Sequence, residues 1–230
     1  MTRATVTMNS TSALWTTDNM KIQIVHAAAR QSGGVVVKIR MTDGEFRETR
    51  SLVLSELEWA RLGLAVGDEL DEARFDALEC AAEYCEAMRR GAELLSYGAN
   101  SRSALAIKLR RRGYDRQLCE RVAAELYAKG YINESADAEG IVRSCLARGY
   151  GKKRIVIKLR ERGYENEVIA RVLDGLDDVD FAESCAALIR KRCGGELPTQ
   201  RAEYDKLVAA MVRYGYSYGE IKEALEICRS

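Results

Sequence analysis

The amino-acid sequence predicts a mainly α-helical protein, in which three tandem three-helix repeats follow a small β-containing N-terminal module. Three observations support this fold class. An eight-residue motif recurs after 50 positions, only one proline occurs in 230 residues, and strand-like runs before residue 55 flank a hairpin signal. Repeats of this length are typical of stacked helical arrays, and scarce proline leaves helices uninterrupted.

The first twenty residues are rich in Ser, Thr and Asn and contain no continuous apolar stretch. This composition favours a disordered tail over residues 1–20. It does not match a secretory signal peptide, which needs an apolar stretch and a cleavage site. Elsewhere no apolar run approaches the roughly 18 residues of a membrane span. We therefore expect a cytoplasmic protein with no membrane contact.

Residues 21–70 combine strand and helix signals in one small module. The predicted strands are Lys21–Val25, Val35–Thr42 and Phe46–Leu54. Asp43-Gly44 between the last two is a typical two-residue hairpin turn. Ser55 and Glu58 have the spacing of a capping box that opens a short helix, and Gly63 is expected to end it.

From residue 71 onward the strand signals stop and helices follow one another. A long helix is predicted from Glu72 to Ser96. The helices of the three repeats are predicted at 81–97, 101–112 and 115–129, at 135–148, 152–162 and 165–176, and at 179–193, 200–214 and 217–228. Repeat 1 with its lead-in helix then occupies residues 71–130, repeat 2 residues 131–177 and repeat 3 residues 178–230.

The repeat is clearest in one motif. Ile107–Tyr114 matches Ile157–Tyr164 at seven of eight positions, and a weaker third copy ends in Gly215-Tyr216. Gly-Tyr pairs begin at residues 113, 130, 149, 163 and 215, each after a helical pattern. A glycine in the left-handed conformation commonly ends a helix. We expect each tyrosine to pack back on the helix that it follows, and interpret these rings as structural rather than base-stacking.

Side chains that carry much enzyme chemistry are scarce. The chain has one histidine, His26, and contains no phosphate-binding loop or nucleophile motif. Its seven cysteines form no C-x-x-C pair, so we expect no zinc site. They are interpreted as free thiols of a reducing compartment. We therefore expect neither a cofactor nor catalytic activity.

Charge is distributed unevenly, although the net charge is only +1. Residues 43–93 hold 6 Lys and Arg against 14 Asp and Glu, a net charge of −8, whereas residues 101–165 hold 16 against 8, a net charge of +8. Such separation predicts an acidic partner or a polyanion for the middle of the chain. The candidate partner- or DNA-binding residues are Lys108, Arg110, Arg111, Arg112, Lys152, Lys153, Arg154, Lys158, Arg160 and Arg162.

Helical spacing places Leu105, Leu109, Ile155 and Leu159 toward the core and the cations mainly on the outer side. The three cations at 152–154 open a helix, where they oppose its dipole, and this favours a functional reason for them. An ordinary solvated helix face explains the other cations as well as a binding surface does. A basic surface also fits DNA phosphate and acidic protein alike.

A series of weak motifs extends over residues 85–228 in a specific order. The motifs are Ser101, Lys108-Leu109, Gly113-Tyr114, Gly130–Asn133, Val142-Arg143, Gly151–Ile155, Leu159, Gly163-Tyr164, Arg213–Tyr216, Ile221 and Ala224-Leu225. Their order and spacing resemble the RecX family of RecA regulators, whose fold is three tandem three-helix repeats. Glu134 stands where that family has an aspartate.

The resemblance implies a negative regulator of the RecA recombinase that binds the groove of the RecA–single-stranded DNA filament and inhibits strand exchange and ATP hydrolysis. It would act in homologous recombination, the regulation of DNA repair and the SOS response. The implied partner is the RecA filament, with single-stranded or double-stranded DNA as a further partner, and we expect a monomer.

The alternative is a direct DNA-binding helical protein that acts without RecA, because three-helix units are similar to helix-turn-helix domains. Asp115–Lys129 contains one Gln and Glu165–Leu176 one Asn. These helices would have to read bases, and so few base-reading side chains favour the regulator.

Overall fold

The structure is a computed structural model that describes residues 20–229. Two compact units divide the chain. The first holds the residues up to Tyr97 together with Leu105–Leu126, and the second holds Gly98–Ala104 and the residues from Tyr127 onward. The predicted fold class is confirmed, since a small antiparallel sheet precedes a series of helices. The predicted tail, residues 1–20, lies outside the described residues except for Met20.

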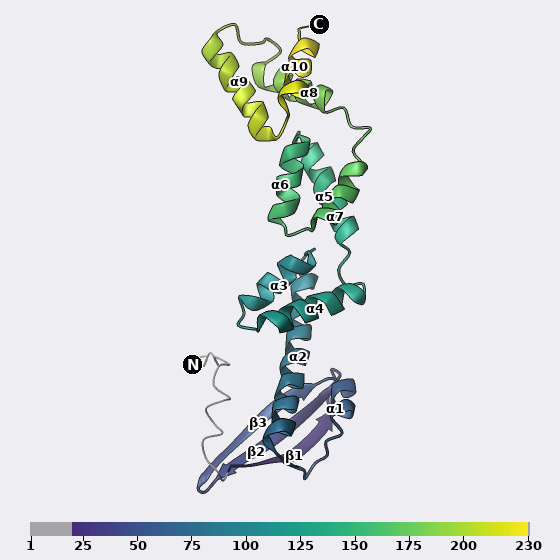
Figure 1. Cartoon of the computed structure of the whole chain (residues 1–230), viewed down its shortest axis with the longest axis vertical. Helices are drawn as coiled ribbons and strands as arrows, with labels where there is room; N and C mark the ends of the chain where they lie inside the picture. Colours follow the sequence, from purple (N-terminus) through teal and green to yellow (C-terminus); the bar gives the residue numbers. More distant parts are fainter. Residues whose placement is uncertain (1–19, 230) are drawn as a thin grey trace. The chain divides into compact units, whose positions relative to one another are not determined.

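A four-stranded antiparallel sheet opens the first unit (Figure 1). Its strands are β1 (Lys21–Ala29), β2 (Val35–Asp43), β3 (Phe46–Leu54) and β4 (Glu69–Leu70), in the order β3-β2-β1-β4. β1 continues past its predicted end at Val25, because Ala27–Ala29 pair with β2 although alanine is a poor strand former. β4 was not predicted, since two residues carry no periodic pattern.

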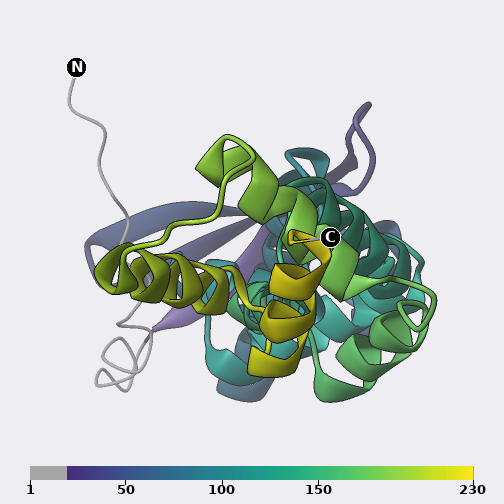
Figure 2. The ribbon, with the colours of Figure 1, turned by 90° about the horizontal axis from the view of Figure 1, so that it is seen from above.

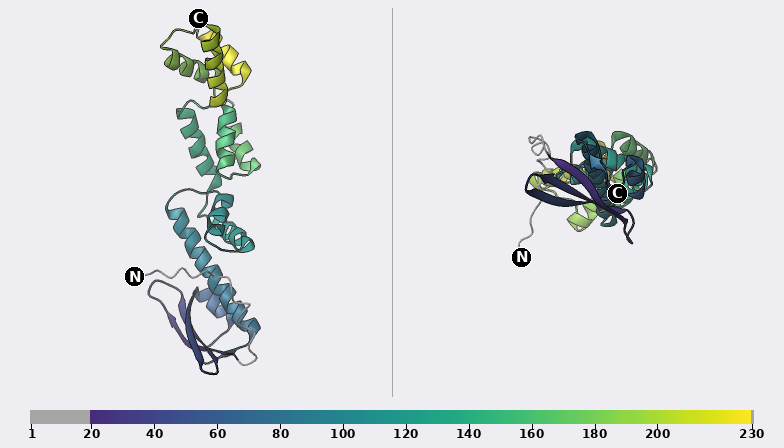
Figure 3. Two further views of the ribbon diagram at one scale, coloured as in Figure 1. Left: turned by 90° about the vertical axis from the view of Figure 1, so that its left-hand side faces the viewer. Right: turned by 90° about the horizontal axis from the view of Figure 1, so that it is seen from below.

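One face of the sheet is covered by α2 (Glu72–Ser96), which has the predicted bounds (Figures 1 and 3). Alternate side chains of the strands face this helix, as strand geometry requires. The buried residues of this core include Ile22, Ile24, Val37, Ile39, Leu54, Phe75 and Leu78. The short helix α1 (Glu56–Leu62) begins at Ser55, whose Oγ accepts a hydrogen bond from the Glu58 N–H at 3.1 Å, and ends at Gly63 as predicted.

The helices α3 (Arg102–Arg110) and α4 (Arg116–Ala128) complete the first three-helix repeat. Gly91 of α2 lies where these helices pack. A Cβ atom on Gly91 would lie 2.6 Å from Leu126 Cδ1 and 3.3 Å from Val122 Cγ1, with a methyl of Leu105 next. Leu105 and Leu126 are buried, so a glycine in the middle of α2 allows the close approach of this small core.

The second unit contains the remaining two repeats. Repeat 2 consists of α5 (Glu134–Ala147), α6 (Lys152–Glu161) and α7 (Asn166–Asp174), and repeat 3 of α8 (Phe181–Cys193), α9 (Arg201–Tyr214) and α10 (Tyr218–Ile227). Figure 2 shows the helices of repeat 3, coloured green to yellow, from above. A single continuous core extends from Ala138 to Leu225 through both repeats.

The Gly-Tyr pairs end helices as predicted, because all five glycines have positive φ angles. The expected packing of the tyrosines is confirmed at Tyr164 and Tyr216, which are 6% and 1% exposed. It is wrong at Tyr131, which is 63% exposed. There the next residue, Ile132, is buried instead and takes the inward place that the tyrosine was expected to fill.

Among the described residues, no helix is long and apolar enough to cross a membrane. In the same part of the chain, no three His, Cys, Asp or Glu side chains are grouped in a way that could hold a metal ion. The predicted module boundaries after residues 20, 70, 130 and 177 stay predictions.

Candidate partner-binding surface

The first group of candidate residues lies at the end of α3, in the first unit. Arg110, Arg111 and Arg112 are exposed and Lys108 is half-buried. Arg112 Nη1 donates a hydrogen bond to the Lys108 carbonyl oxygen at 3.5 Å, beside the C-terminus of the helix. We call these four residues the α3 basic cluster. Because the helix dipole favours cations at a helix C-terminus, stabilisation of α3 also explains their position.

The second group lies on α6, in the second unit. We call it the α6 basic surface, and its members are Lys152, Lys153, Arg154, Lys158, Arg160 and Arg162. The prediction that Ile155 and Leu159 face the core is confirmed, since both are fully buried. Lys152, Lys153, Arg160 and Arg162 are exposed and Arg154 is half-buried, so most of the cations do lie on the outer side.

Lys158 is the half-buried lysine of the α6 basic surface. Its side chain is only 35% exposed, and its Nζ donates a hydrogen bond to Glu161 Oε2 at 2.7 Å. The nearby ammonium holds the pKa of the Glu161 carboxyl below its usual value. Lys158 therefore lies at the flank of α6, and a neighbour on its own helix partly neutralises it.

An exposed isoleucine lies among the cations of both helices. Ile157 is 43% exposed, and residues one helical turn away include Lys153 and Arg160. Ile107 has the equivalent position on α3 and is 46% exposed. An apolar centre with a polar rim is typical of protein interfaces, whereas a purely electrostatic surface needs no such side chain.

The start of α6 is capped by the end of another helix. No side chain caps α6 at Gly151. Instead, the Gly151 N–H donates to the Tyr214 carbonyl oxygen at 2.9 Å and the Lys153 N–H donates to that of Gly215 at 3.1 Å. Carbonyl groups at the C-terminus of α9 thus meet N–H groups at the N-terminus of α6, so opposite ends of two helix dipoles lie together.

A similar contact occurs at the start of α3. Ser101 Oγ donates to the Arg162 carbonyl oxygen at 2.8 Å and accepts from the Ala104 N–H at 3.1 Å. The end of α6 therefore contacts Ser101 as the end of α9 contacts Gly151, and both positions open the middle helix of a repeat. Arg162, a candidate binding residue, is fixed by this contact through its backbone while its side chain stays exposed.

Buried Glu134 also holds the first turn of α3. Its carboxylate accepts hydrogen bonds from the Arg102 backbone N–H at 2.8 Å and from Arg102 Nε at 3.2 Å. The Arg102 guanidinium lies 4.5 Å from the centre of the Tyr127 ring. Glu134 is 3% exposed, so this departure from the family pattern is a structural cap.

Arg154 of the α6 basic surface begins a row of two arginines and two tyrosines. Arg154 lies 6.0 Å from the Tyr150 ring centre, and the Tyr150 and Tyr214 rings are 5.6 Å apart and tilted by 58°. Arg192 lies 4.8 Å from the Tyr214 ring and donates to its hydroxyl at 3.1 Å. Sequence reasoning missed Tyr150, Tyr214 and Arg192 as neighbours of the candidate site, because three separate helix ends bring them together.

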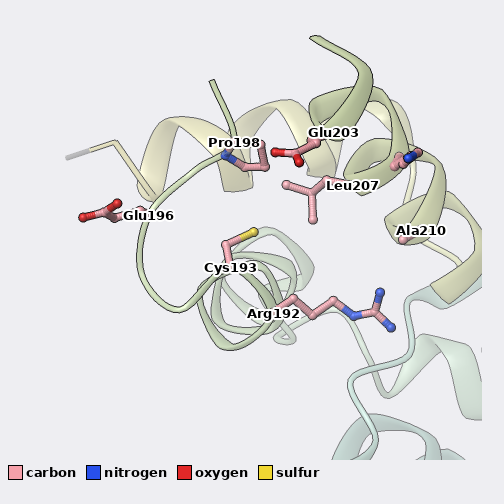
Figure 4. A pocket seen from close by; sticks show the side chains of 8 residues that line it. Arg192, Cys193, Glu196, Pro198, Glu203, Leu207 and Ala210 are labelled. Atoms are coloured by element: carbon pink, nitrogen blue, oxygen red, sulfur yellow. The ribbon is translucent and has the colours of Figure 1, made fainter. Parts of the chain in front are cut away.

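Next to Arg192 is an open cavity of about 430 Å³ between the end of α8 and the first turns of α9 (Figure 4). Its lining combines apolar Leu207 and Cys193 with two cations, Arg192 and Lys206, and two carboxylates, Glu196 and Glu203. The charges balance, so the cavity has no preference for an anion and does not extend the α6 basic surface.

Comparison with known proteins points to one family. The chain is 34% identical over 140 residues to the regulatory protein RecX of Halorhodospira halophila. This alignment covers 60% of this chain and 86% of that protein. It is 30% identical over 148 residues to the regulatory protein RecX of Corynebacterium efficiens, which covers 61% of this chain and 70% of the relative. No family profile matches.

The chain belongs to the RecX family. A crystal structure of a regulatory protein RecX has the same fold, with a TM-score of 0.67 at 20% identity, and the match covers 89% of this chain and 99% of that one. A RecX structure from Lactobacillus salivarius matches with a TM-score of 0.55 over 64% of this chain. The RecX resemblance predicted from the motifs is therefore confirmed.

Proposed function

We propose that this RecX-family protein is a negative regulator of RecA that binds the groove of the RecA–single-stranded DNA filament and inhibits strand exchange and ATP hydrolysis. Its relatives are regulatory proteins by name. The α6 basic surface carries the proposal, because its three N-terminal cations, Lys152, Lys153 and Arg154, occupy a helix start, where acidic side chains are usually favoured.

The composition of the surface fits a filament that presents protein and DNA together. Exposed Ile157 supplies an apolar contact of the kind that protein interfaces use. Lys153 and Arg160 beside it complement acidic side chains or phosphates. We propose that the protein acts through binding alone, without a catalytic step of its own.

The alternative, a DNA-binding protein that reads bases without RecA, has less support. Arg116 of α4 pairs with Glu120 at 2.8 Å, and Arg171 of α7 donates to the Ser135 hydroxyl at 3.1 Å. The amides of Gln117 and Asn166 are the exposed base-reading groups of the two helices that would enter a groove. One amide per helix is too little for specific readout.

The test compares three targets at matched salt by fluorescence anisotropy: naked single-stranded DNA, free RecA, and the RecA–DNA filament. A filament regulator binds the filament more tightly than either component, and it lowers the RecA ATPase rate. Equal affinity for naked DNA and the filament would contradict the proposal and support the alternative.

A charge-reversed variant locates the surface. We expect Lys152→Glu/Lys153→Glu/Arg160→Glu to lose filament inhibition. The matched control reverses three exposed cations elsewhere in the second unit, Arg201→Glu/Lys206→Glu/Lys222→Glu, and should inhibit like the unmodified chain. If both variants lose inhibition equally, net charge rather than the α6 basic surface is responsible.

A further inference from the structure

The β-sheet has one face that α2 does not cover. Strand pairing fixes which residues lie on it, because side chains alternate between the faces. Lys38 and Arg40 of β2 point away from the buried Val37 and Ile39, and both are exposed. We call this surface the open sheet face.

The register brings the polar residues of the open sheet face into rows. Thr42 pairs with Lys21 and Arg47, Arg40 pairs with Gln23 and Thr49, and Lys38 pairs with His26 and Ser51. Glu69 of β4 pairs with Gln23 and adds the one carboxylate among the described residues of these rows. Four cations against one carboxylate, 4 − 1, give a net charge of +3 with His26 neutral.

Several cations elsewhere in the first unit are ion-paired. Arg50, on the covered face, pairs with Glu48 at 2.9 Å and with Glu79 of α2 at 3.3 Å. Arg61 pairs with Glu58, and Arg74 with Asp68. By contrast, within the described part of the chain no ion pair involves the cations of the open sheet face, which are Lys21, Lys38, Arg40 and Arg47.

This segregation is notable because residues 21–70 as a whole carry no net charge, with 7 Lys and Arg against 7 Asp and Glu. Apart from Glu69, the carboxylates lie outside the three rows, and Asp43 and Glu45 lie at the hairpin turn. Positive charge is thus concentrated on one flat surface of a neutral module. A strong local potential of this kind recruits a polyanion.

We propose that the open sheet face binds the phosphate backbone of duplex DNA. Lys, Arg, Ser, Thr and Gln are the side chains that contact phosphates, and the three polar rows consist mainly of these types. The rows carry no Phe, Tyr or Trp side chain, so they lack the stacking platforms that single-strand binders combine with basic charge. They also lack the large aromatic anchors of protein–protein interfaces, and the apolar residues of this face, Ala28, Val36 and Val53, form the next row at one end.

The contact would be independent of sequence, because phosphates carry no base information. It does not rest on the proposed regulation of RecA, since the residues and the partner differ from those of the α6 basic surface. It gives the N-terminal module a role of its own, holding the protein on a duplex.

The experiment measures how the affinity of the full chain for a fluorescein-labelled 20-base-pair duplex depends on salt, without RecA. The variant is Lys38→Gln/Arg40→Gln/Arg47→Gln. Each phosphate contact contributes about 0.9 to the slope of log K against log salt, so the slope should fall by about 2–3, and the affinity at low salt by about tenfold or more.

The matched control, Arg61→Gln/Arg74→Gln/Arg89→Gln, removes the same charge from three ion-paired residues of the same unit. Its slope should equal that of the unmodified chain. An unchanged slope in the open-face variant overturns the proposal. A loss of affinity only for a single-stranded probe also overturns it and would assign the face to single strands. A loss of affinity only for the RecA filament overturns it too and would assign the face to a protein. Filament inhibition, measured separately, reports on the proposed function alone.

Discussion

At the residue scale, Gly215 and Gly113 share a backbone conformation but not their surroundings. Both end a helix with φ at 98°. The space around Gly113 is open, whereas a Cβ atom on Gly215 would overlap the backbone of Arg154. Gly151 faces the same contact from the other side, with its added Cβ 2.6 Å from the Gly215 carbonyl group. Side chains are therefore excluded where the end of α9 meets the start of α6.

We expect Gly113→Ala to lower the free energy of unfolding by about 1–2 kcal/mol, the cost of left-handed backbone for a residue with a Cβ. Gly215→Ala should cost clearly more, since the overlap adds to the same backbone cost. Chemical denaturation of the two variants measures the difference. Equal losses would show that the close approach at Arg154 is not essential.

Cys185 gives a pH prediction. Burial raises the pKa of this thiol to about 12 from 9.0. Between these values the folded state keeps a proton that the unfolded chain has lost. The stability that the buried Cys185 thiol contributes is therefore fully present below pH 9. It falls by about 1.4 kcal/mol per pH unit as the pH rises from 9 toward 12. In urea denaturation, Cys185→Ala should have a lower free energy of unfolding than the unmodified chain near neutral pH, but should lose less of it as the pH rises above 9. Equal losses in the two proteins would contradict the raised pKa of the thiol.

At the element scale, α6 combines a well-defined core face with an unfavourable start. Ile155 and Leu159 anchor the helix by full burial. Its N-terminus carries Lys152 and Lys153 instead of the acidic residues that a helix start favours. The carbonyl of Gly215 accepts from the Lys153 N–H and supplies part of the missing negative charge. α6 therefore depends on the end of α9 for its cap.

We expect Lys152→Glu/Lys153→Glu to change the free energy of unfolding by less than about 1 kcal/mol, because the α9 carbonyls that cap α6 offset the dipole that acidic side chains would complement. The same variant should bind the RecA filament less tightly. Thermal melting and anisotropy on one preparation check both results. A larger loss of stability together with weaker binding would mean that the two lysines serve the fold rather than a partner.

Glu134 has the corresponding role for α3. Because its carboxylate holds both the Arg102 backbone N–H and the Arg102 guanidinium, we expect Glu134→Ala to lower the free energy of unfolding by about 1–3 kcal/mol. Glu134→Gln keeps an acceptor for the backbone N–H and should lose less. A neutral result in both variants would contradict the capping role.

At the scale of the whole molecule, repeats 2 and 3 share one hydrophobic core. It includes Val142 of α5, Met211 of α9 and Leu225 of α10. The cores of the two repeats are thus continuous, as those of neighbours in a repeat array usually are. The long helix α2, in turn, contributes Phe75 and Leu78 to the core of the sheet, so its first half belongs with the N-terminal module.

A fragment of residues 131–229 should therefore fold and unfold in one cooperative transition, with a helical circular dichroism spectrum. A fragment of residues 71–229 should also be helical, but it would expose Phe75 and Leu78 and bind a hydrophobic dye. Two separate transitions in the shorter fragment would show that repeats 2 and 3 are independent.

The sequence by itself determined the local elements. The capping signal at Ser55, the long helix at 72–96 and the glycine ends of the helices were all predicted, because each depends on residues within one or two turns. The cations at 152–154 were also recognised, since their place at a helix start is a local property.

Only the tertiary structure decided what lies against these elements. β4 exists because Ile22 offers a partner to Leu70. The row from Arg154 to Arg192, the cap at Gly215 and the basic rows of the open sheet face follow from chain segments that meet from distant positions. Local patterns carry no information about such neighbours, since the free energy of a long-range contact depends on both partners and on the packing that joins them.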